Sequence, residues 1–288
     1  MPGPLAGLTV IEIASIGPEH FCAMMLADMG TTVVRVDRRD QVGRPAHASD
    51  VINRDRRSIA LDLKQPAAVE TLLELIDGAE SLVEGFRPGV MEHLVVSREI
   101  CLARNPRLVF GRMTGWGQEG PLAKAAGHDI NYIALSGALS AIGLEADAAP
   151  VPPLNLANVF GGGAVFLAYG VVCALLEAAR SGRGQVIGPA MVDGSALVMS
   201  MFFGMNADMR WPGQGQSALG GTTHYYGGYR CADGEWISIG SIEPQFYELL
   251  LRTLGIEAPA TWPQNDASRW PALKAKLAET FASRTRAE

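Results

Sequence analysis

Short apolar runs alternate with segments of helical spacing over residues 8–113. The apolar runs predict strands at Leu8–Ile13, Thr32–Val36, Ser58–Leu61, Ser81–Phe86 and Leu108–Met113. Between them, apolar residues recur at the spacing of one helix face over Phe21–Met29, Ala67–Leu75 and Met91–Ala103. Strands that alternate with helices are typical of a mostly parallel sheet flanked by helices, so we predict an α/β fold.

The second half of the chain has a different pattern, with longer helical segments at Ile130–Leu139, Ala164–Ala179 and Ala196–Met209. A glycine-rich polar stretch follows, which we interpret as a linker. The pattern then predicts a hairpin with strands Tyr225–Cys231 and Glu235–Ile239, and helices at Phe246–Leu254 and Ala272–Phe281. We therefore predict a large α/β domain over residues 1–195, a linker over 196–224 and a smaller α+β domain over 225–288.

Composition excludes several classes of protein. With 48% apolar and 19% charged residues among 288, the chain is neither disordered, nor collagen-like, nor a small disulfide scaffold. The formal net charge of −6 argues against a general binder of nucleic acid or of anionic membranes, because these depend on an overall basic field. Any anionic ligand must therefore meet a local concentration of basic side chains.

Residues 148–176 carry no charge, but prolines interrupt the first half and the apolar run Ala164–Leu176 is too short to span a bilayer comfortably. We predict a buried core helix there and no membrane association. The four cysteines have no paired spacing and lie in apolar surroundings, which predicts reduced, buried thiols and no metal site; they are Cys22, Cys101, Cys173 and Cys231. No secretion signal is recognisable, so we expect a cytoplasmic protein.

Basic residues outnumber acidic ones locally, with eight against five between residues 35 and 64. Arg38, Lys64 and Arg87 each follow a predicted strand. Ligands of open α/β sheets bind beyond the carboxyl ends of the strands, so these cations could converge on phosphate groups there. An ordinary solvated face is the alternative reading. A dinucleotide fingerprint is absent, since the segment after the first strand has Gly17 alone beside Pro18, which excludes NAD and FAD.

The motifs VVRVDR, VEGFRPGV, GHDINY and NVFGGG occur in this order along the chain. In these segments the chain resembles the α-methylacyl-CoA racemase group of the family III CoA-transferases (CaiB/BaiF type). The resemblance implies a Rossmann-like large domain, a smaller domain and an interlocked homodimer. It also implies an acyl-CoA thioester as the ligand, lying across the large domain, with no cofactor beyond its CoA moiety.

The resemblance further assigns residues to the two parts of the site. Those implied for CoA binding are Arg38, Arg57, Ala60, Leu63, Lys64, Gly85, Phe86, Arg87, His93, Gly127 and Tyr132. His128 is implied as the base that removes the α-proton, and the backbone N–H of Asp129 as a donor to the enolate oxygen. Glu243 corresponds to a small-domain glutamate that orients the histidine.

The chain departs from the family pattern at the second acid/base. Relatives have an aspartate before the aromatic residue and glycines of NVFGGG, where this chain has Val159. Because the valine side chain has no ionisable proton, we predict that the chain racemises 2-methylacyl-CoA by 1,1-proton transfer, and that this activity is impaired. A CoA-transferase is one alternative, although the same aspartate accepts the acyl group in the transferases. An inactive acyl-CoA binder or dimer partner is another.

Three further departures concern the first loop, position 93 and the end of the sequence. Relatives commonly read GPGP after the first strand, where this chain has Gly17, Pro18, Glu19 and His20. An arginine that contacts CoA phosphate in relatives is His93 here. Relatives also continue past the last predicted helix with a segment that returns to the large domain, so we expect an incomplete small domain and a looser dimer. The apolar helices do not discriminate among acyl groups.

Overall fold

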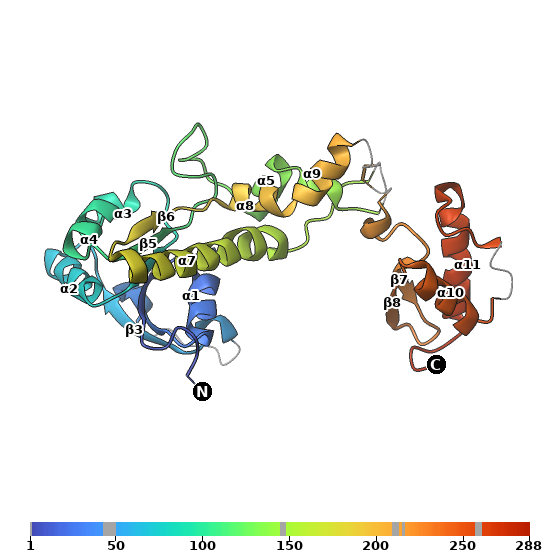
Figure 1. The fold of residues 1–288 in the computed structure, drawn as a ribbon, viewed down its shortest axis with the longest axis horizontal. Helices are drawn as coiled ribbons and strands as arrows, with labels where there is room; N and C mark the ends of the chain where they lie inside the picture. Colours follow the sequence, from blue (N-terminus) through green and yellow to red (C-terminus); the bar gives the residue numbers. More distant parts are fainter. Residues whose placement is uncertain (1, 43–49, 145–147, 209–212, 215–216, 257–260) are drawn as a thin grey trace. The chain divides into compact units, whose positions relative to one another are not determined.

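The computed structural model describes residues 2–42, 50–144, 148–208, 213–214, 217–256 and 261–288. The chain folds as two compact units, the first formed by Met1–Gly137 with Pro153–Met199 and the second by Ala138–Pro152 with Ser200–Glu288 (Figure 1). Each is described separately below. The domain limits predicted from sequence stay predictions, as does the interlocked dimer.

The first unit is built on a six-stranded parallel sheet with the order β3-β2-β1-β4-β5-β6. Its strands are β1 (Thr9–Ile13), β2 (Thr32–Arg38), β3 (Arg56–Leu61), β4 (Ser81–Glu84), β5 (Val109–Arg112) and β6 (Gln185–Ile187). The central strands β4 and β5 are buried along their whole length, which explains the apolar pairs Leu82–Val83 and Val109–Phe110 at their centre and start. The α/β class predicted from the alternating pattern is therefore confirmed.

Helices cover both faces of this sheet (Figure 1). On one face α1 (Pro18–Asp28) and α7 (Val165–Ser181) pack with Val10, Val83 and Val109 in one core. On the other face α2 (Pro66–Asp77) and α4 (Arg98–Arg104) pack on a second core. The other helical elements described in the unit are α3 (Val90–His93), α5 (Asp129–Leu135), α8 (Met191–Val198), the short 3-10 helices η1 (Arg39–Gln41) and η2 (Val51–Asn53), and the π-helical segment η3 (Leu156–Ala164).

Three predicted helices are divided in the structure. Met91–Ala103 is split into α3 and α4, because Val95 adopts a left-handed conformation with φ 60° and Ser97 caps the start of α4. Ile130–Leu139 is split into α5 and α6 (Ala138–Ala141), and Gly137 between them has φ 81°. The predicted helix Ala196–Met209 is instead α8 and α9 (Ser200–Ala207), and Met209 itself lies outside the described residues.

The apolar segment Leu156–Ser181, formed by η3 and α7, is the one helix among the described residues that is long and apolar enough to cross a membrane. Its inner side packs in the first core through Leu167, Val171 and Ala174. Its outer side is exposed at Tyr169 and Leu176. The segment thus serves as a structural helix of the α/β unit.

The prediction of four buried thiols is wrong for one cysteine. Cys22, Cys101 and Cys231 are buried, but Cys173 is exposed, because it lies on the outer side of α7. All four are free thiols.

The second unit contains the antiparallel hairpin of β7 (Tyr226–Arg230) and β8 (Trp236–Gly240), which confirms the predicted hairpin. Two helices, α10 (Pro244–Thr253) and α11 (Trp270–Ala282), accompany it. Tyr229, Tyr247, Leu251, Leu273 and Leu277 form its separate buried core.

Candidate ligand groove and catalytic residues

A groove runs across the carboxyl ends of β1, β2, β3 and β4. It consists of two adjoining hollows of about 660 and 600 Å³. The hollows share the lining residues Ala14, Asp37, Arg38, Phe86 and Val90. Its position follows from the parallel topology, which brings the carboxyl ends of all the strands to one edge of the sheet.

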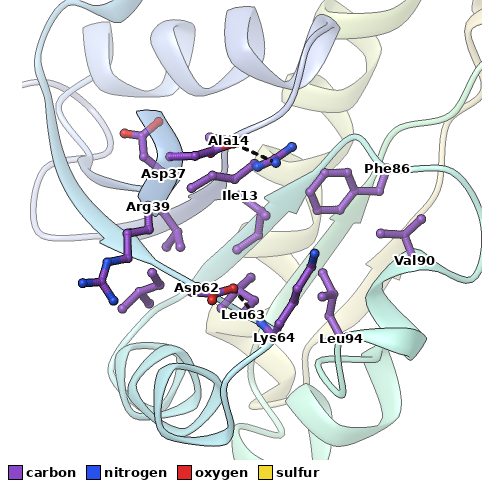
Figure 2. A pocket seen from close by; sticks show the side chains of 14 residues that line it. Ile13, Ala14, Asp37, Arg39, Asp62, Leu63, Lys64, Phe86, Val90 and Leu94 are labelled. Atoms are coloured by element: carbon purple, nitrogen blue, oxygen red, sulfur yellow. Dashed lines mark hydrogen bonds and ion pairs between the residues drawn. The ribbon is translucent and has the colours of Figure 1, made fainter. Parts of the chain in front are cut away.

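Basic side chains line this groove at the strand ends. Lys64 follows β3, and Figure 2 shows its side chain extending toward Phe86, whereas Arg39 points away. Arg38 ends β2 with its side chain 74% exposed, and it pairs with Asp40 at 2.9 Å. Arg87 lines the second hollow. These exposed cations over an apolar floor suit a ligand with both phosphate groups and an apolar arm.

The turn that carries Phe86 and Arg87 is fixed by a buried carboxylate. Glu84, 1% exposed at the end of β4, accepts a hydrogen bond from the Phe86 N–H at 2.7 Å. It also accepts from the Arg112 Nε–H at 3.1 Å. Burial raises the pKa of Glu84 to about 7, although the Phe86 N–H and Arg112 act in the opposite direction. The turn is therefore held from beneath by groups that do not face the groove.

The structure brings together some of the residues expected to bind CoA. Those that line the groove are Arg38, Leu63, Lys64, Gly85, Phe86 and Arg87. Arg57 and Ala60 are exposed on β3, and His93 is exposed at the end of α3, but none of the three lines the groove. Asp37, Asp62 and Ser15 line it without having been predicted. Their positions at or just past strand ends are the signal that would have found them.

The other two predicted residues, Gly127 and Tyr132, lie away from these hollows. Tyr132 is 5% exposed and stacks edge-on against Trp116, with ring centroids 4.6 Å apart. It fills the space beside Gly115 and Gly127, where a Cβ would overlap its ring. Burial raises the pKa of Tyr132, and the charge of Arg87 partly opposes this. The charge of the groove residue Arg87 therefore acts on the hydroxyl of Tyr132, a residue of α5.

His128 immediately precedes α5 and is exposed, so its ring is not packed into an interior. Its backbone N–H donates to the Asn131 Oδ1 at 2.9 Å, which fixes the start of the helix. The next residue, Asp129, is 6% exposed. Its Oδ1 accepts from the Val159 N–H at 3.0 Å. Positions 128, 129 and 159 therefore lie at one place in the fold.

The segment η3 places Val159. Its glycines allow close backbone packing, since a Cβ on Gly194 of α8 would overlap the Gly162 carbonyl. Asn158, the neighbour of Val159, is fully buried and its side-chain amide has no hydrogen-bond partner among the described residues. It cannot take over proton transfer, because an amide does not titrate.

Glu243 lies in the second unit, exposed, just before α10. Its relation to His128 stays a prediction. Among the described residues, no group of three or more His, Cys, Asp or Glu side chains is arranged to hold a metal ion.

Comparison with known proteins gives concordant similarities. Residues 5–288 match CoA-transferase family III. The chain is 45% identical over 285 residues to alpha-methylacyl-CoA racemase of Mus musculus, covering 99% of this chain and 73% of that protein. It is 44% identical over 287 residues to alpha-methylacyl-CoA racemase of Homo sapiens, with the same two coverages. A CaiB/BaiF family protein of Brucella suis has a crystal structure that superposes with a TM-score of 0.84 at 25% identity, over 100% of this chain and 80% of that one.

Proposed function

The chain belongs to CoA-transferase family III, and from that premise we propose that it racemises 2-methylacyl-CoA thioesters. The observation that carries the proposal is a cationic groove beyond the strand ends in the same unit as His128, which is exposed at the start of α5. A CoA thioester has the phosphates and the apolar arm that such a groove accommodates. The similarity to two mammalian racemases supports the same reaction.

In the proposed mechanism, Arg38, Lys64 and Arg87 bind the phosphate groups of CoA. The thioester lies beside His128, which removes the α-proton as a general base. The N–H of Asp129 donates to the enolate oxygen while the negative charge is there. Racemisation is complete when a proton returns to the α-carbon from the opposite face.

The return step is the weak point of this chain. Val159 occupies the position at which the family carries an acid, and valine has no proton to give. The loss of one general acid or base typically slows a reaction by about 10²–10⁴-fold. We therefore propose slow racemisation. We also propose a homodimer in which a second copy's small unit, with its Glu243, covers the thioester.

Exchange in D₂O tests this function. Each epimer of a 2-methylacyl-CoA is incubated with the protein, and α-deuterium and configuration are measured by NMR and chiral chromatography. Incorporation of deuterium with slow inversion is the expected result. An inert acyl-CoA binder, the alternative that Val159 favours, would bind both epimers and incorporate no deuterium.

Val159→Asp should restore an acid at position 159 and raise the rate of inversion by about 10²-fold or more. Val151→Asp is a matched control, because Val151 is a 66% exposed valine of the second unit. Equal rates for the two variants would mean that position 159 does not limit the reaction. A covalent acyl anhydride trapped on the unsubstituted protein would instead indicate CoA transfer.

A further inference from the structure

We propose that the hydroxyl of Ser15, backed by the carboxyl of Glu19, delivers the proton that inverts the α-carbon in this chain. The inference rests on the proposed function and names the group that replaces the missing aspartate. Neither residue is among those that the family resemblance assigns to the reaction. Ser15 would be the catalytic residue, since it faces the groove, and Glu19 would act through it.

The two side chains form a closed pair at the end of β1. Ser15 lines the second hollow of the groove, and its Oγ–H donates to the Glu19 Oε1 at 2.5 Å. Glu19, in the first turn of α1, has an exposure of 0%. Its second oxygen, Oε2, is buried and has no hydrogen-bond partner among the described residues. A carboxyl that is buried without a cation and linked to a groove hydroxyl is unusual for a purely structural group.

The pair lies beside the elements that carry the rest of the site. A Cβ at position 85 would overlap the Glu19 Oε2, so the carboxyl sits directly under the turn that bears Phe86 and Arg87. The same helix α1 packs against η3, with the rings of Phe21 and Phe160 at 4.9 Å. Glu19 therefore lies between the groove and the segment from which the family's aspartate is missing.

The chemistry of the pair suits an acid. Burial raises the pKa of Glu19 and outweighs the opposing hydrogen bond from Ser15, so the carboxyl holds its proton more readily than an exposed one. In the proposed step Glu19 is protonated and the hydrogen bond between the two groups is reversed, so that the Glu19 O–H donates to the Ser15 Oγ and the Ser15 O–H faces the ligand. The Ser15 O–H bond then breaks as a C–H bond forms at the α-carbon, and the Glu19 proton moves to the Ser15 Oγ, which leaves Glu19 as a carboxylate. The reverse sequence removes the proton from the other epimer.

The titratable groups near Glu19 are paired with one another and not with the Ser15 hydroxyl. His20, next to Glu19 on α1, places its Nδ1 at 2.5 Å from the Glu12 Oε1 and its Nε2 at 3.0 Å from an Arg35 nitrogen. Glu12 also pairs with Arg56 at 2.5 Å. These groups act on Glu19 through their charges only, with His20 lowering and Glu12 raising its pKa. None of them contacts the Ser15 hydroxyl among the hydrogen bonds of the described residues.

The experiment follows both epimers in D₂O with Glu19→Gln and Ser15→Ala. We expect inversion to fall by about 100-fold or more in each variant. Exchange with retention, which needs only His128, should persist for the epimer whose α-proton faces His128, and this shows that the variants are folded. Glu80→Gln is the matched control, because Glu80 accepts from the Thr9 N–H at the other edge of the sheet. It should leave inversion unchanged.

Two further readouts separate a proton donor from a structural group. In the unsubstituted protein, inversion of the epimer whose α-proton His128 removes should decline as pH rises and Glu19 ionises, whereas Glu19→Gln should lose this decline. Adding Val159→Asp to Glu19→Gln should rescue inversion.

Inversion that survives in Glu19→Gln would overturn the inference and leave the proposed function standing. Retention alone in the unsubstituted protein, or no deuterium in either epimer, would overturn the proposed function, and the inference with it.

Discussion

Arg56 and Arg57 are adjacent on β3 but occupy opposite environments. The Arg56 side chain is 2% exposed and pairs at 2.5 Å with Glu12, whose side chain is fully buried on β1. Since β2 lies between β1 and β3, this ion pair bridges strands that are not neighbours. Arg57, by contrast, is exposed. Because successive side chains of a strand point to opposite faces, Arg56 has a structural role and Arg57 lies at the surface.

This difference predicts unequal effects of the same substitution. Arg56→Met should lower the free energy of unfolding by about 3–5 kcal/mol, because it leaves the Glu12 carboxylate buried without its cation. Arg57→Met should change it by less than about 0.5 kcal/mol. Urea denaturation of both variants measures the difference. Similar midpoints for the two would show that the buried pair does not contribute to stability.

At the scale of elements, the contact between η3 and α8 fixes Val159. Gly162 and Gly194 let the two backbones approach more closely than any side chain would allow. The π-helical course of η3 places Asn158 inward and leaves Val159 partly buried. The close contact between Gly162 of η3 and Gly194 of α8 thus fixes position 159, from which a second acid would act.

Gly194→Ala should destabilise the protein by about 1–3 kcal/mol, since the new methyl group meets the Gly162 carbonyl of the backbone. Gly188→Ala is the control, because a Cβ there meets nothing within 4 Å. Differential scanning calorimetry compares the two melting temperatures. If Gly194→Ala melted no lower than Gly188→Ala, the close approach would not be a constraint.

The sequence pattern predicts elements well where local signals and burial agree. The runs of β1, β4 and β5 are mostly apolar because nearly all of their residues are buried, and the charged residues among them, Glu12, Glu84 and Arg112, are buried in ion pairs. The pattern does not predict β6, because a strand of three residues is too short to show an alternation of apolar and polar positions. It also fails at the break before α4, because Val95 is left-handed although it is β-branched and no glycine or asparagine marks a turn there.

The candidate site is predictable to a similar degree. Arg38, Lys64 and Arg87 can be placed in advance because each follows a strand, and parallel strands end at one edge. The pairing of Ser15 with Glu19 cannot, since it depends on how the first turn of α1 folds back over the end of β1. The family resemblance implies Arg57 as a CoA-binding residue, but on β3 its side chain is exposed outside the groove lining.

At the scale of the whole molecule, the two units hold buried titratable groups of opposite kinds. His224, fully buried in the second unit, lies with its Nε2 at 2.7 Å from the Tyr247 hydroxyl. Tyr247 donates its proton to the Trp262 carbonyl at 3.1 Å, so it accepts from the His224 Nε2–H. The Nδ1 has no partner among the described residues, and burial lowers the pKa of His224 to about 4. In the first unit, burial raises the pKa of Glu19.

These shifts predict that acid acts oppositely on the two units. Between pH 6.5 and about 4 the unfolded chain binds a proton at position 224 that the folded chain excludes, so acidification weakens the second unit by up to roughly 3 kcal/mol. Burial raises the pKa of Glu19, so above pH 4.5 the folded chain binds a proton at position 19 more readily than the unfolded chain does, and acidification strengthens the first unit. Hydrogen exchange followed by mass spectrometry at pH 7 and 5 reports on each unit separately.

His224→Gln should remove the acid sensitivity of the second unit. Glu19→Gln should reduce the acid strengthening of the first unit, to which the buried Glu84, with its pKa near 7, also contributes. Parallel changes in both units on acidification, in the unsubstituted protein, would contradict the assignment.

All residues that line the two hollows of the groove lie between Ile13 and Leu94. A single recombination event spanning that stretch of the gene would therefore transfer all the residues that line the groove, Ser15 included, together with Glu19. His128 and Val159 are encoded downstream of it. Ligand recognition and the residue at position 159 can thus be inherited from different parents.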